Sequence, residues 1–283
     1  MSDQKKEKEV SDQKIRVEIS GGVATLFLVN PPMNVVTLDL THQLNAELTR
    51  LEADPSIGAL VITGDGDRAF CTGSDIHEFP ELLAEDAVVS RKLAFENETF
   101  TKFANFPKPT VVAIEGYALG GGMELASGAD IIVVAENAKF GVPEIKLGAI
   151  PGSGGTVRIT RRIGIGRVSE LMLLGDMIDA QQALAWGYAN RITPKGETLA
   201  LAQEIAAKLA SGAKQAICAC KQALRYGMYL PEEQAIAKLL DVLDVLSRTE
   251  DLHEGADAFI NKRPPNFRDP LDTSKFVGCM FPK

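Results

Sequence analysis

The sequence predicts an α/β fold in which short buried strands alternate with helices. Two β-rich runs, residues 15–19 and 23–28, are joined by a Gly-Gly pair, a spacing typical of a β-hairpin. Leucines at helical spacing follow in residues 38–51, and the apolar run at residues 57–63 is typical of a buried strand. Two strands, a helix and a further strand together indicate the start of a ββα unit.

Further elements continue this alternation along the chain. Residues 80–106 form a polar stretch without glycine that is expected to be helical, and residues 111–114 are expected to be a buried strand. Three helices and a short strand are expected next, at residues 156–163, 167–174, 179–187 and 188–192. The last part of the chain is expected to be almost entirely helical, at residues 199–210, 214–226, 231–248 and 251–261.

Length and composition limit the classes of protein that fit. The chain has 283 residues, enough for one large domain or for one domain with an appendage. Its net charge of −8, without a basic stripe, argues against a nucleic-acid partner. No apolar run approaches the roughly 20 residues that a membrane-spanning helix needs, so no membrane partner is expected. Residues 1–13 mix both charge signs, and we expect a disordered arm there rather than a targeting signal.

The cysteines and histidines show no pattern of metal ligands. Cys71, Cys218, Cys220 and Cys279 are widely scattered, which favours a reduced, cytoplasmic protein. On a helix, Cys218 and Cys220 would point to different faces, and the three histidines lack ligand spacing. We therefore expect no metal site.

A run of three glycines, Gly120, Gly121 and Gly122, follows the strand at residues 111–114 and opens a helical segment. Consecutive glycines cost backbone entropy and add no packing, so stability alone does not require them. They let the backbone approach a ligand closely and point unpaired N–H groups at it, and a helix start adds the positive end of its dipole. The pattern indicates a site for an anion, or for an oxygen that becomes anionic during a reaction.

Two glutamates lie close to these glycines in the sequence. Glu124 is in the first turn of the expected helix, and Glu144 follows Pro143 further along the chain. Each is ordinary alone, because Glu is common in a first helical turn and Pro-Glu is a common helix start. Together, two carboxylates beside an oxyanion-binding turn can move two protons around one developing negative charge.

Two other glycine-containing motifs belong to enzyme classes that the surrounding residues disfavour. GDGDRA at residues 64–69 has the form of a dinucleotide-binding fingerprint, but Asp65 and Asp67 would repel a pyrophosphate and no helix start follows. PGSGG at residues 151–155 lacks the G-x-S-x-G order of a nucleophile elbow, and no histidine is placed to activate its serine. A nucleotide-dependent oxidoreductase and a serine hydrolase are therefore both disfavoured.

Three segments together resemble the signature regions of the enoyl-CoA hydratase/isomerase (crotonase) superfamily: GYALGGGMELASGAD at residues 116–130, GVPEIKLGAIPGSGG at residues 141–155 and RAFCTGSDIHEF at residues 68–79. The resemblance covers about residues 14–268. It implies a spiral of repeated ββα units that carries the active site, at residues 14–198. A C-terminal helical trimerisation region follows at residues 199–262, and a tail at residues 263–283.

The resemblance also implies roles for individual residues. The backbone N–H groups of Ser74 and Gly121 would form an oxyanion hole for a thioester oxygen, which leaves the Ser74 hydroxyl incidental. Glu124 would position and deprotonate water, and Glu144 would deliver a proton to carbon. Further contacts with the substrate and its CoA are expected from Cys71, Gly73, Asp75, Ile76, Gly120, Gly122 and, on a neighbouring subunit, Lys262.

The function that the resemblance favours is an enoyl-CoA hydratase that adds water reversibly to a 2-enoyl-CoA thioester. An enoyl-CoA isomerase or another crotonase-type lyase is the alternative, and a non-catalytic acyl-CoA-binding protein is a third possibility that loss of a glutamate would have favoured. No cofactor is implied, since CoA enters with the substrate. Apolar residues form a wide stripe in the C-terminal helices: Ile236, Leu239, Leu240, Leu243 and Leu246. Packing on the chain's own core fits this stripe, and so does the homotrimer or dimer of trimers that the resemblance implies.

Overall fold

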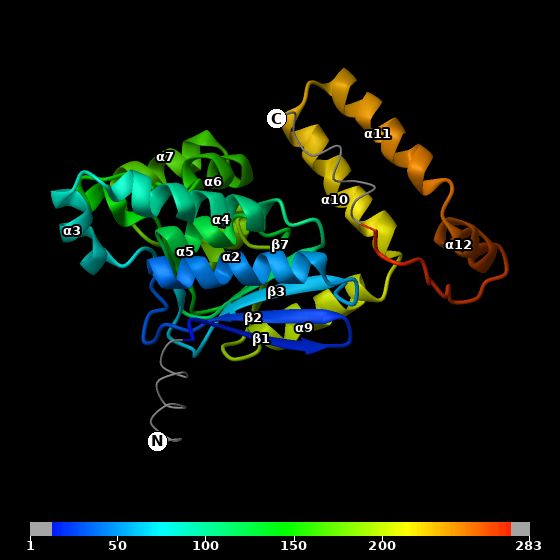
Figure 1. Cartoon of the computed structure of the whole chain (residues 1–283), viewed down its shortest axis with the longest axis horizontal. Coiled ribbons are helices and arrows are strands. Elements are labelled where there is room, and N and C mark those ends of the chain that lie inside the picture. The colour runs from blue at the N-terminus through cyan, green and yellow to red at the C-terminus, as the bar shows by residue number, and fades with distance from the viewer. Residues whose placement is uncertain (1–12, 273–283) are drawn as a thin grey trace.

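The computed structural model describes residues 13–272, which form an α/β protein with two β-sheets, as the sequence predicts (Figure 1). The strands of the six-stranded sheet are β1 (Ile15–Ser20), β2 (Val23–Leu28), β3 (Ala59–Gly64), β5 (Thr110–Ile114), β7 (Ile131–Ala135) and β10 (Arg191–Thr193). The strands of the four-stranded sheet are β4 (Ala69–Cys71), β6 (Tyr117–Leu119), β8 (Lys139–Gly141) and β9 (Ile178–Asp179). The arm predicted at residues 1–13, except its last residue, and the tail beyond residue 272 lie outside the described residues.

The larger sheet has the spatial order β1-β2-β3-β5-β7-β10. The hairpin predicted from the first two β-rich runs is confirmed, because β1 pairs antiparallel with β2 and Ile15 lies opposite Leu28. The remaining neighbours in this sheet are all parallel. Parallel strands are normally covered on both faces, which accounts for the nearly continuous apolar runs in β3 and β5.

Alternate residues of the central strands face two different hydrophobic clusters. Val112 and Ile114 of β5 point into the main core, where they meet apolar residues from the helices on that face. Val111 and Ala113 point to the opposite face and pack against α9 (Thr198–Ala210). Small alanines line the inner face of α9, so this helix lies close to the sheet: Ala202, Ala206 and Ala210. The sheet is therefore a rigid support with both faces buried.

The helices outside the C-terminal region are α2 (Leu38–Ala53), α3 (Phe79–Ala84), α4 (Ala94–Ala104), α5 (Gly121–Ala126), α6 (Gly155–Ile163), α7 (Ile165–Leu174) and α8 (Ala180–Trp186), with short helical turns η1 (Ile76–Glu78), η2 (Val88–Leu93) and η3 (Pro143–Leu147). The single helical stretch predicted at residues 80–106 is wrong in its continuity, because a non-helical break and the π-helical turn η2 separate α3 from α4. The strand predicted at residues 188–192 begins later, as β10. Asp179 caps α8, accepting a hydrogen bond from the N–H of Gln182 at 2.8 Å.

The last three helices stand apart from the sheet (Figure 1). They are α10 (Lys214–Tyr229), α11 (Glu232–Leu246) and α12 (Glu250–Ile260). α10 and α11 pack against each other around Val242, whereas α9 belongs to the sheet. The domain division at residue 199 remains a proposal, and it separates α9 from the strands it packs on. Within residues 13–272, no helix is both long and apolar enough to cross a membrane.

Candidate active site

The carboxyl ends of β4, β6 and β8 lie side by side, because these three strands are parallel neighbours in the smaller sheet. Each strand leads into one part of the predicted site. Ser74 follows β4, Gly121 follows β6, and Glu144 follows β8. Sites in open α/β sheets typically form at the carboxyl ends of parallel strands. The fold thus brings three segments that are far apart in the sequence to one edge of this sheet.

Two backbone segments approach each other closely at this edge. A Cβ atom on Gly73 would lie 3.0 Å from the backbone nitrogen of Gly121, and a Cβ atom on Gly121 would lie 3.6 Å from the backbone nitrogen of Ser74. Gly73 and Gly120 have φ angles of +91° and +51°, which a residue with a Cβ atom rarely adopts. Glycine is therefore required here both by the conformation and by the space.

The N–H groups of Ser74 and Gly121 are available to a ligand. The carbonyl of Gly73 accepts a hydrogen bond from the N–H of Val36, and the N–H of Asp75 donates to the carbonyl of Val36. In an extended segment, the Ser74 N–H between them points to the opposite side. Gly121 is the first residue of α5, where an N–H group has no acceptor within the helix. Two such groups at one place are suited to bind a single, partly negative oxygen.

Glu124 is held in the site by backbone donors from a distant loop. Its side chain is 2% exposed, and Oε1 accepts hydrogen bonds from the N–H groups of Ser153 at 2.8 Å and Gly155 at 2.7 Å. A Cβ atom on Gly155 would lie 2.6 Å from Cγ of Glu124. Glycine at position 155 therefore lets the start of α6 approach the carboxylate closely enough to donate both bonds.

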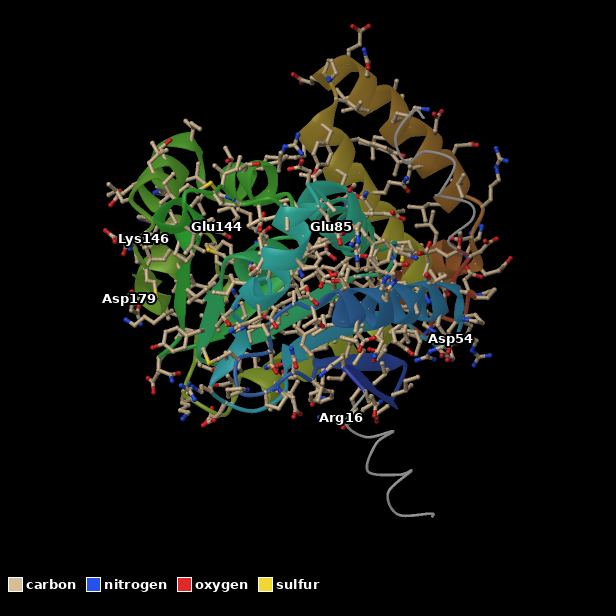
Figure 2. The ribbon with its side chains drawn as sticks, turned by 60° about the vertical axis from the view of Figure 1, so that its left-hand side comes forward. Arg16, Asp54, Glu85, Glu144, Lys146 and Asp179 are labelled. Carbon is tan, nitrogen blue, oxygen red and sulfur yellow. The ribbon has the colours of Figure 1, made fainter. Side chains whose placement is uncertain are left out.

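Glu144 reaches the same place from the other side. Its Oε1 lies 2.8 Å from the position that a Cβ atom on Gly120 would take, so its carboxylate contacts the glycine turn. Within the described part of the chain, Oε2 of Glu144 is buried and receives no hydrogen bond. Figure 2 shows Glu144 on the green part of the ribbon, on the same segment as Lys146. A buried acceptor without a partner is unusual in a folded protein, and it is a natural place for a substrate or a water molecule to bind.

The environment raises the affinity of both carboxylates for a proton. Burial raises the pKa of Glu124 to about 7, against the effect of the Gly155 N–H, and the nearby charge of Glu144 raises it further. Burial also raises the pKa of Glu144, and the charge of Glu96 acts in the same direction. A carboxylate such as Glu124, with a pKa near neutral pH, is well suited to exchange protons with a substrate.

Glu96 is a third carboxylate at this site, and no sequence motif indicates it. It lies in the first turn of α4, is 1% exposed, and accepts hydrogen bonds from the hydroxyl groups of Ser74 at 2.9 Å and Ser153 at 2.6 Å. The hydroxyl of Ser74 therefore has a definite partner, which differs from the incidental role expected from the sequence. Glu96 lies in a polar stretch with helical spacing, and the sequence of such a stretch does not distinguish a buried glutamate from an exposed one.

The remaining predicted residues lie at different distances from these carboxylates. Cys71 is buried at the end of β4, and a Cβ atom on Gly122 would lie 2.0 Å from its carbonyl oxygen, so α5 packs directly on β4. Asp75 caps the short turn η1, in which Ile76 is 57% exposed. Lys262 is exposed just beyond α12, which Figure 1 places well away from α5. The structure of one chain thus brings all of the predicted residues except Lys262 to the loops around the glycine turn.

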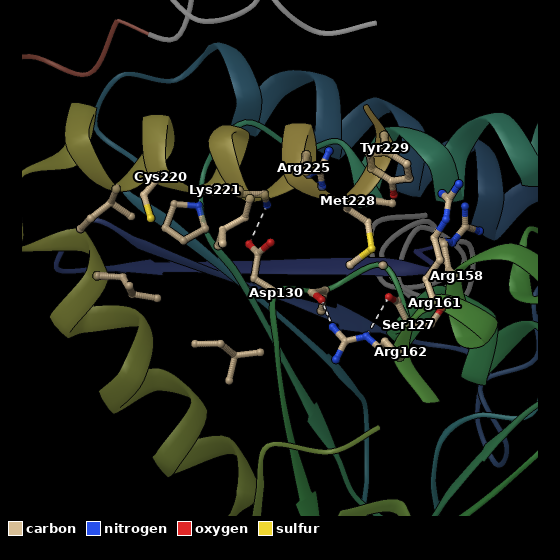
Figure 3. A pocket seen from close by; sticks show the side chains of 18 residues that line it. Ser127, Asp130, Arg158, Arg161, Arg162, Cys220, Lys221, Arg225, Met228 and Tyr229 are labelled. Atoms are coloured by element: carbon tan, nitrogen blue, oxygen red, sulfur yellow. Dashed lines mark hydrogen bonds and ion pairs between the residues drawn. The ribbon is translucent and has the colours of Figure 1, made fainter. Parts of the chain in front are cut away.

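A separate cavity of about 710 Å³ lies between α10 and the segment after α5 (Figure 3). Its lining includes several cations but neither Glu124 nor Glu144. Lys221 forms an ion pair with Asp130 at 2.6 Å, and Arg162 donates to the carbonyl of Ser127 at 3.2 Å. Lys221 therefore connects α10 to the core, whereas Arg162 connects α6 to the segment after α5. Among residues 13–272, no group of acidic, cysteine and histidine side chains is arranged to hold a metal ion.

The raised pKa of Glu124 predicts a pH-dependent stability. Below about pH 4.5 Glu124 is protonated in both the folded and the unfolded chain. Between about pH 4.5 and pH 7 Glu124 loses its proton in the unfolded chain but keeps it in the folded chain. Its contribution to the free energy of unfolding therefore falls as the pH rises through this range. We expect Glu124→Gln to remove this fall and to be more stable than the natural protein at pH 8 by on the order of 1–3 kcal/mol.

Urea unfolding at pH 5 and pH 8 measures this difference. Glu170→Gln is the matched control, because Glu170 is exposed on α7. An equal pH dependence in the natural protein and Glu124→Gln would contradict the assigned environment of Glu124.

Comparison with known proteins identifies the family. The family model for enoyl-CoA hydratase/isomerase matches residues 18–270. The chain is 38% identical over 245 residues to the 2,3-dehydroadipyl-CoA hydratase of Escherichia coli (strain K12), covering 86% of this chain and 94% of that protein. It is 34% identical over 249 residues to the short-chain-enoyl-CoA hydratase of Clostridium acetobutylicum, covering 87% and 94%. The crystal structure of an enoyl-CoA hydratase from Bacillus anthracis, 32% identical, superimposes with a TM-score of 0.84 over 90% of this chain and 99% of that one. Residues 18–270 thus contain the whole candidate site, and the chain belongs to the enoyl-CoA hydratase/isomerase family.

Proposed function

We propose that this chain is an enoyl-CoA hydratase that adds water reversibly across the 2,3 double bond of a 2-enoyl-CoA thioester. The observation that carries the proposal is the pair of carboxylates, buried Glu124 and half-buried Glu144, on either side of the Gly120–Gly121 turn. Relatives at 34–38% identity that are named as hydratases support the same reaction type. Membership of the family supports acyl-CoA thioesters as the class of substrate.

The proposed reaction uses each group of the site once. The thioester oxygen accepts hydrogen bonds from the N–H groups of Ser74 and Gly121, which stabilise the negative charge that develops on it. Glu124 accepts a proton from water as the water oxygen forms a bond to C3. Glu144 delivers a proton to C2, so the elements of one water molecule are added and no electrons are exchanged. The two carboxylates interact, so their protons are shared by a coupled pair.

The presence of both glutamates favours hydration over isomerisation. Adding water requires a base for the oxygen nucleophile and an acid for carbon, whereas moving a double bond can use one carboxylate that takes and returns a proton. Glu124 is fixed by two N–H donors, and Glu144 has a free oxygen among the described residues. One carboxylate therefore has a fixed orientation, and the other can still accept a ligand.

Variants of the two glutamates separate the hydratase from the isomerase. Gln keeps the shape of Glu but cannot exchange a proton at neutral pH. We expect Glu124→Gln and Glu144→Gln each to lose about 10²–10⁴ in the kcat for hydration of crotonyl-CoA, because each removes one proton-transfer group. The double variant should lose much less than the product of the two single losses, since both groups act in one step.

The assay follows the absorbance of the conjugated enoyl thioester, with acyl-CoA binding checked by calorimetry and 2,3-dehydroadipyl-CoA as a second substrate. An isomerase would retain conversion of 3-enoyl-CoA to 2-enoyl-CoA in one of the two variants. Near-normal hydration in both single variants, with acyl-CoA still bound, would rule out the two-carboxylate mechanism.

We also propose that the C-terminal helices join subunits into a trimer or a dimer of trimers. In the single chain, Ile236, Leu240 and Leu243 of α11 are 50%, 61% and 47% exposed, and Phe259 and Ile260 of α12 are 87% and 77% exposed. Large apolar side chains in such a group favour a protein contact over solvent. Lys262 lies directly beyond these residues, which supports its proposed contact with the CoA of a neighbouring subunit.

Light scattering at micromolar concentration measures the assembly. We expect a mass of three or six chains for the natural protein. Leu240→Glu and Phe259→Glu place charges in the proposed interface and should shift the mass toward that of one chain, whereas Ile19→Glu, at an exposed apolar residue of the edge strand β1, should not. A monomeric mass for the natural protein would contradict the proposed assembly.

A further inference from the structure

Glu96 connects two loops of the site that come from different parts of the chain. Oε1 of Glu96 accepts a hydrogen bond from the hydroxyl of Ser153 at 2.6 Å, and Oε2 accepts one from the hydroxyl of Ser74 at 2.9 Å. Ser74 belongs to the segment after β4, and Ser153 to the loop before α6. One buried carboxylate on α4 thus joins two loops that are connected to different elements, one to β4 and the other to α6.

Both loops present backbone donors to the proposed chemistry. The N–H of Ser74 is one half of the proposed oxyanion hole. The N–H groups of Ser153 and Gly155 fix Oε1 of Glu124. Each serine therefore uses its hydroxyl on Glu96 and its backbone N–H in the site, and a displacement of Glu96 would move donors on both sides of the substrate at once.

Glu96 lies among polar and charged partners. Burial raises its pKa, while the hydroxyl of Ser153, the charge of Lys92 and the hydroxyl of Ser74 all oppose that shift. Nζ of Lys92 lies 3.9 Å from Oε2 of Glu96, forms an ion pair with Glu78 at 2.5 Å, and donates to the carbonyl of Val36 at 3.0 Å. A buried carboxylate with two hydroxyl donors and a cation nearby has the partners that its charge requires.

We propose that Glu96 is a positioning residue that sets the distance between the Ser74 loop and the Ser153–Gly155 loop, a role that rests on the hydratase function proposed above. It is not a catalytic residue, because it is 1% exposed and its two oxygens already accept hydrogen bonds from the hydroxyl groups of Ser74 and Ser153. The charge of its carboxylate form also acts at a distance on Glu124 and Glu144, and it raises the pKa of both.

This second effect gives a signature that a purely structural role would lack. The charged groups that act on Glu124 are Glu144 on η3, Glu96 on α4 and Arg158 on α6. Glu96 raises the pKa of Glu124, so its neutralisation should lower that pKa. Hydration needs the unprotonated form of Glu124, and the acid limb of the kcat/KM profile should therefore move to lower pH in Glu96→Gln.

The experiment compares Glu96→Gln with Glu98→Gln, since Glu98 is exposed on the same helix. Displaced catalytic groups typically cost up to about 100-fold in rate, and we expect Glu96→Gln to lose about 10- to 100-fold in kcat with a smaller change in KM. Ser153→Ala keeps the N–H that binds Glu124 and removes only the hydroxyl that binds Glu96. It should show a smaller loss of the same kind, and its effect should not add to that of Glu96→Gln.

Hydrogen–deuterium exchange gives a readout that does not depend on activity. Peptides covering residues 71–76 and 151–156 should exchange faster in Glu96→Gln and Ser153→Ala than in the natural protein or Glu98→Gln. If the natural protein hydrates neither substrate, the proposed function fails, and faster exchange in both peptides would still support the connection made by Glu96. Exchange in Glu96→Gln that equals that of the natural protein would overturn the positioning role. If the natural protein does hydrate, an unchanged kcat and an unchanged acid limb in Glu96→Gln would overturn it as well. Should Glu96→Gln not fold, Ser153→Ala decides by the same criteria.

Discussion

Two backbone segments meet at the carboxyl ends of β4 and β6, and the arrangement of the site depends on how close they come. A Cβ atom at Gly73 would lie 3.0 Å from the nitrogen of Gly121, and one at Gly122 would overlap the carbonyl of Cys71. Only glycine allows this contact, which places two N–H groups side by side without the help of a side chain. Because the donors belong to the backbone, one in the segment after β4 and one at a helix start, they need little reorganisation when charge develops on a bound oxygen.

The same closeness brings three carboxylates together, two of them buried and Glu144 half-buried, which would be unfavourable without compensating partners. Each of the three is accommodated differently. Glu124 has two N–H donors, Glu96 has two hydroxyl donors and lies near Lys92, and Glu144 keeps one buried oxygen without a donor among the described residues. These differences suit the carboxylates to different roles. A carboxylate with protein donors on both oxygens holds the structure in place, and one with an oxygen that lacks a protein donor can bind a ligand. Burial dominates the shift for Glu124, and raises its pKa to about 7.

The sequence was sufficient for the elements that have a long and regular pattern. The runs of β2 and β3 are apolar apart from a threonine in each, because both faces of the sheet are covered, and the leucines of α2 recur at helical spacing. Glu124 was predicted in the first helical turn and lies there, because a glycine run before a helix leaves little choice of register. These local patterns, together with the family resemblance, gave the α/β fold and most of the residues around the glycine turn.

The parts that the sequence could not give are those that depend on distant contacts. β4, β6, β8 and β9 have two or three residues each, too few for a period to show, yet they bring the site together. The break between α3 and α4 has no glycine or proline to mark it, and nothing near Glu96 in the sequence indicates its partners. Ser74 and Ser153 come from other loops, so only the folded chain reveals that their hydroxyls meet on one carboxylate.

The central claim is that the contact between the Gly73–Ser74 and Gly120–Gly121 segments forms the binding site for a thioester oxygen. A crystal structure with butyryl-CoA tests it most directly, because this saturated thioester has no double bond to hydrate. The account predicts the thioester oxygen within hydrogen-bond distance of the N–H groups of both Ser74 and Gly121, with C2 and C3 between Glu124 and Glu144. A thioester oxygen bound elsewhere, with both N–H groups left facing solvent or a side chain, would contradict it.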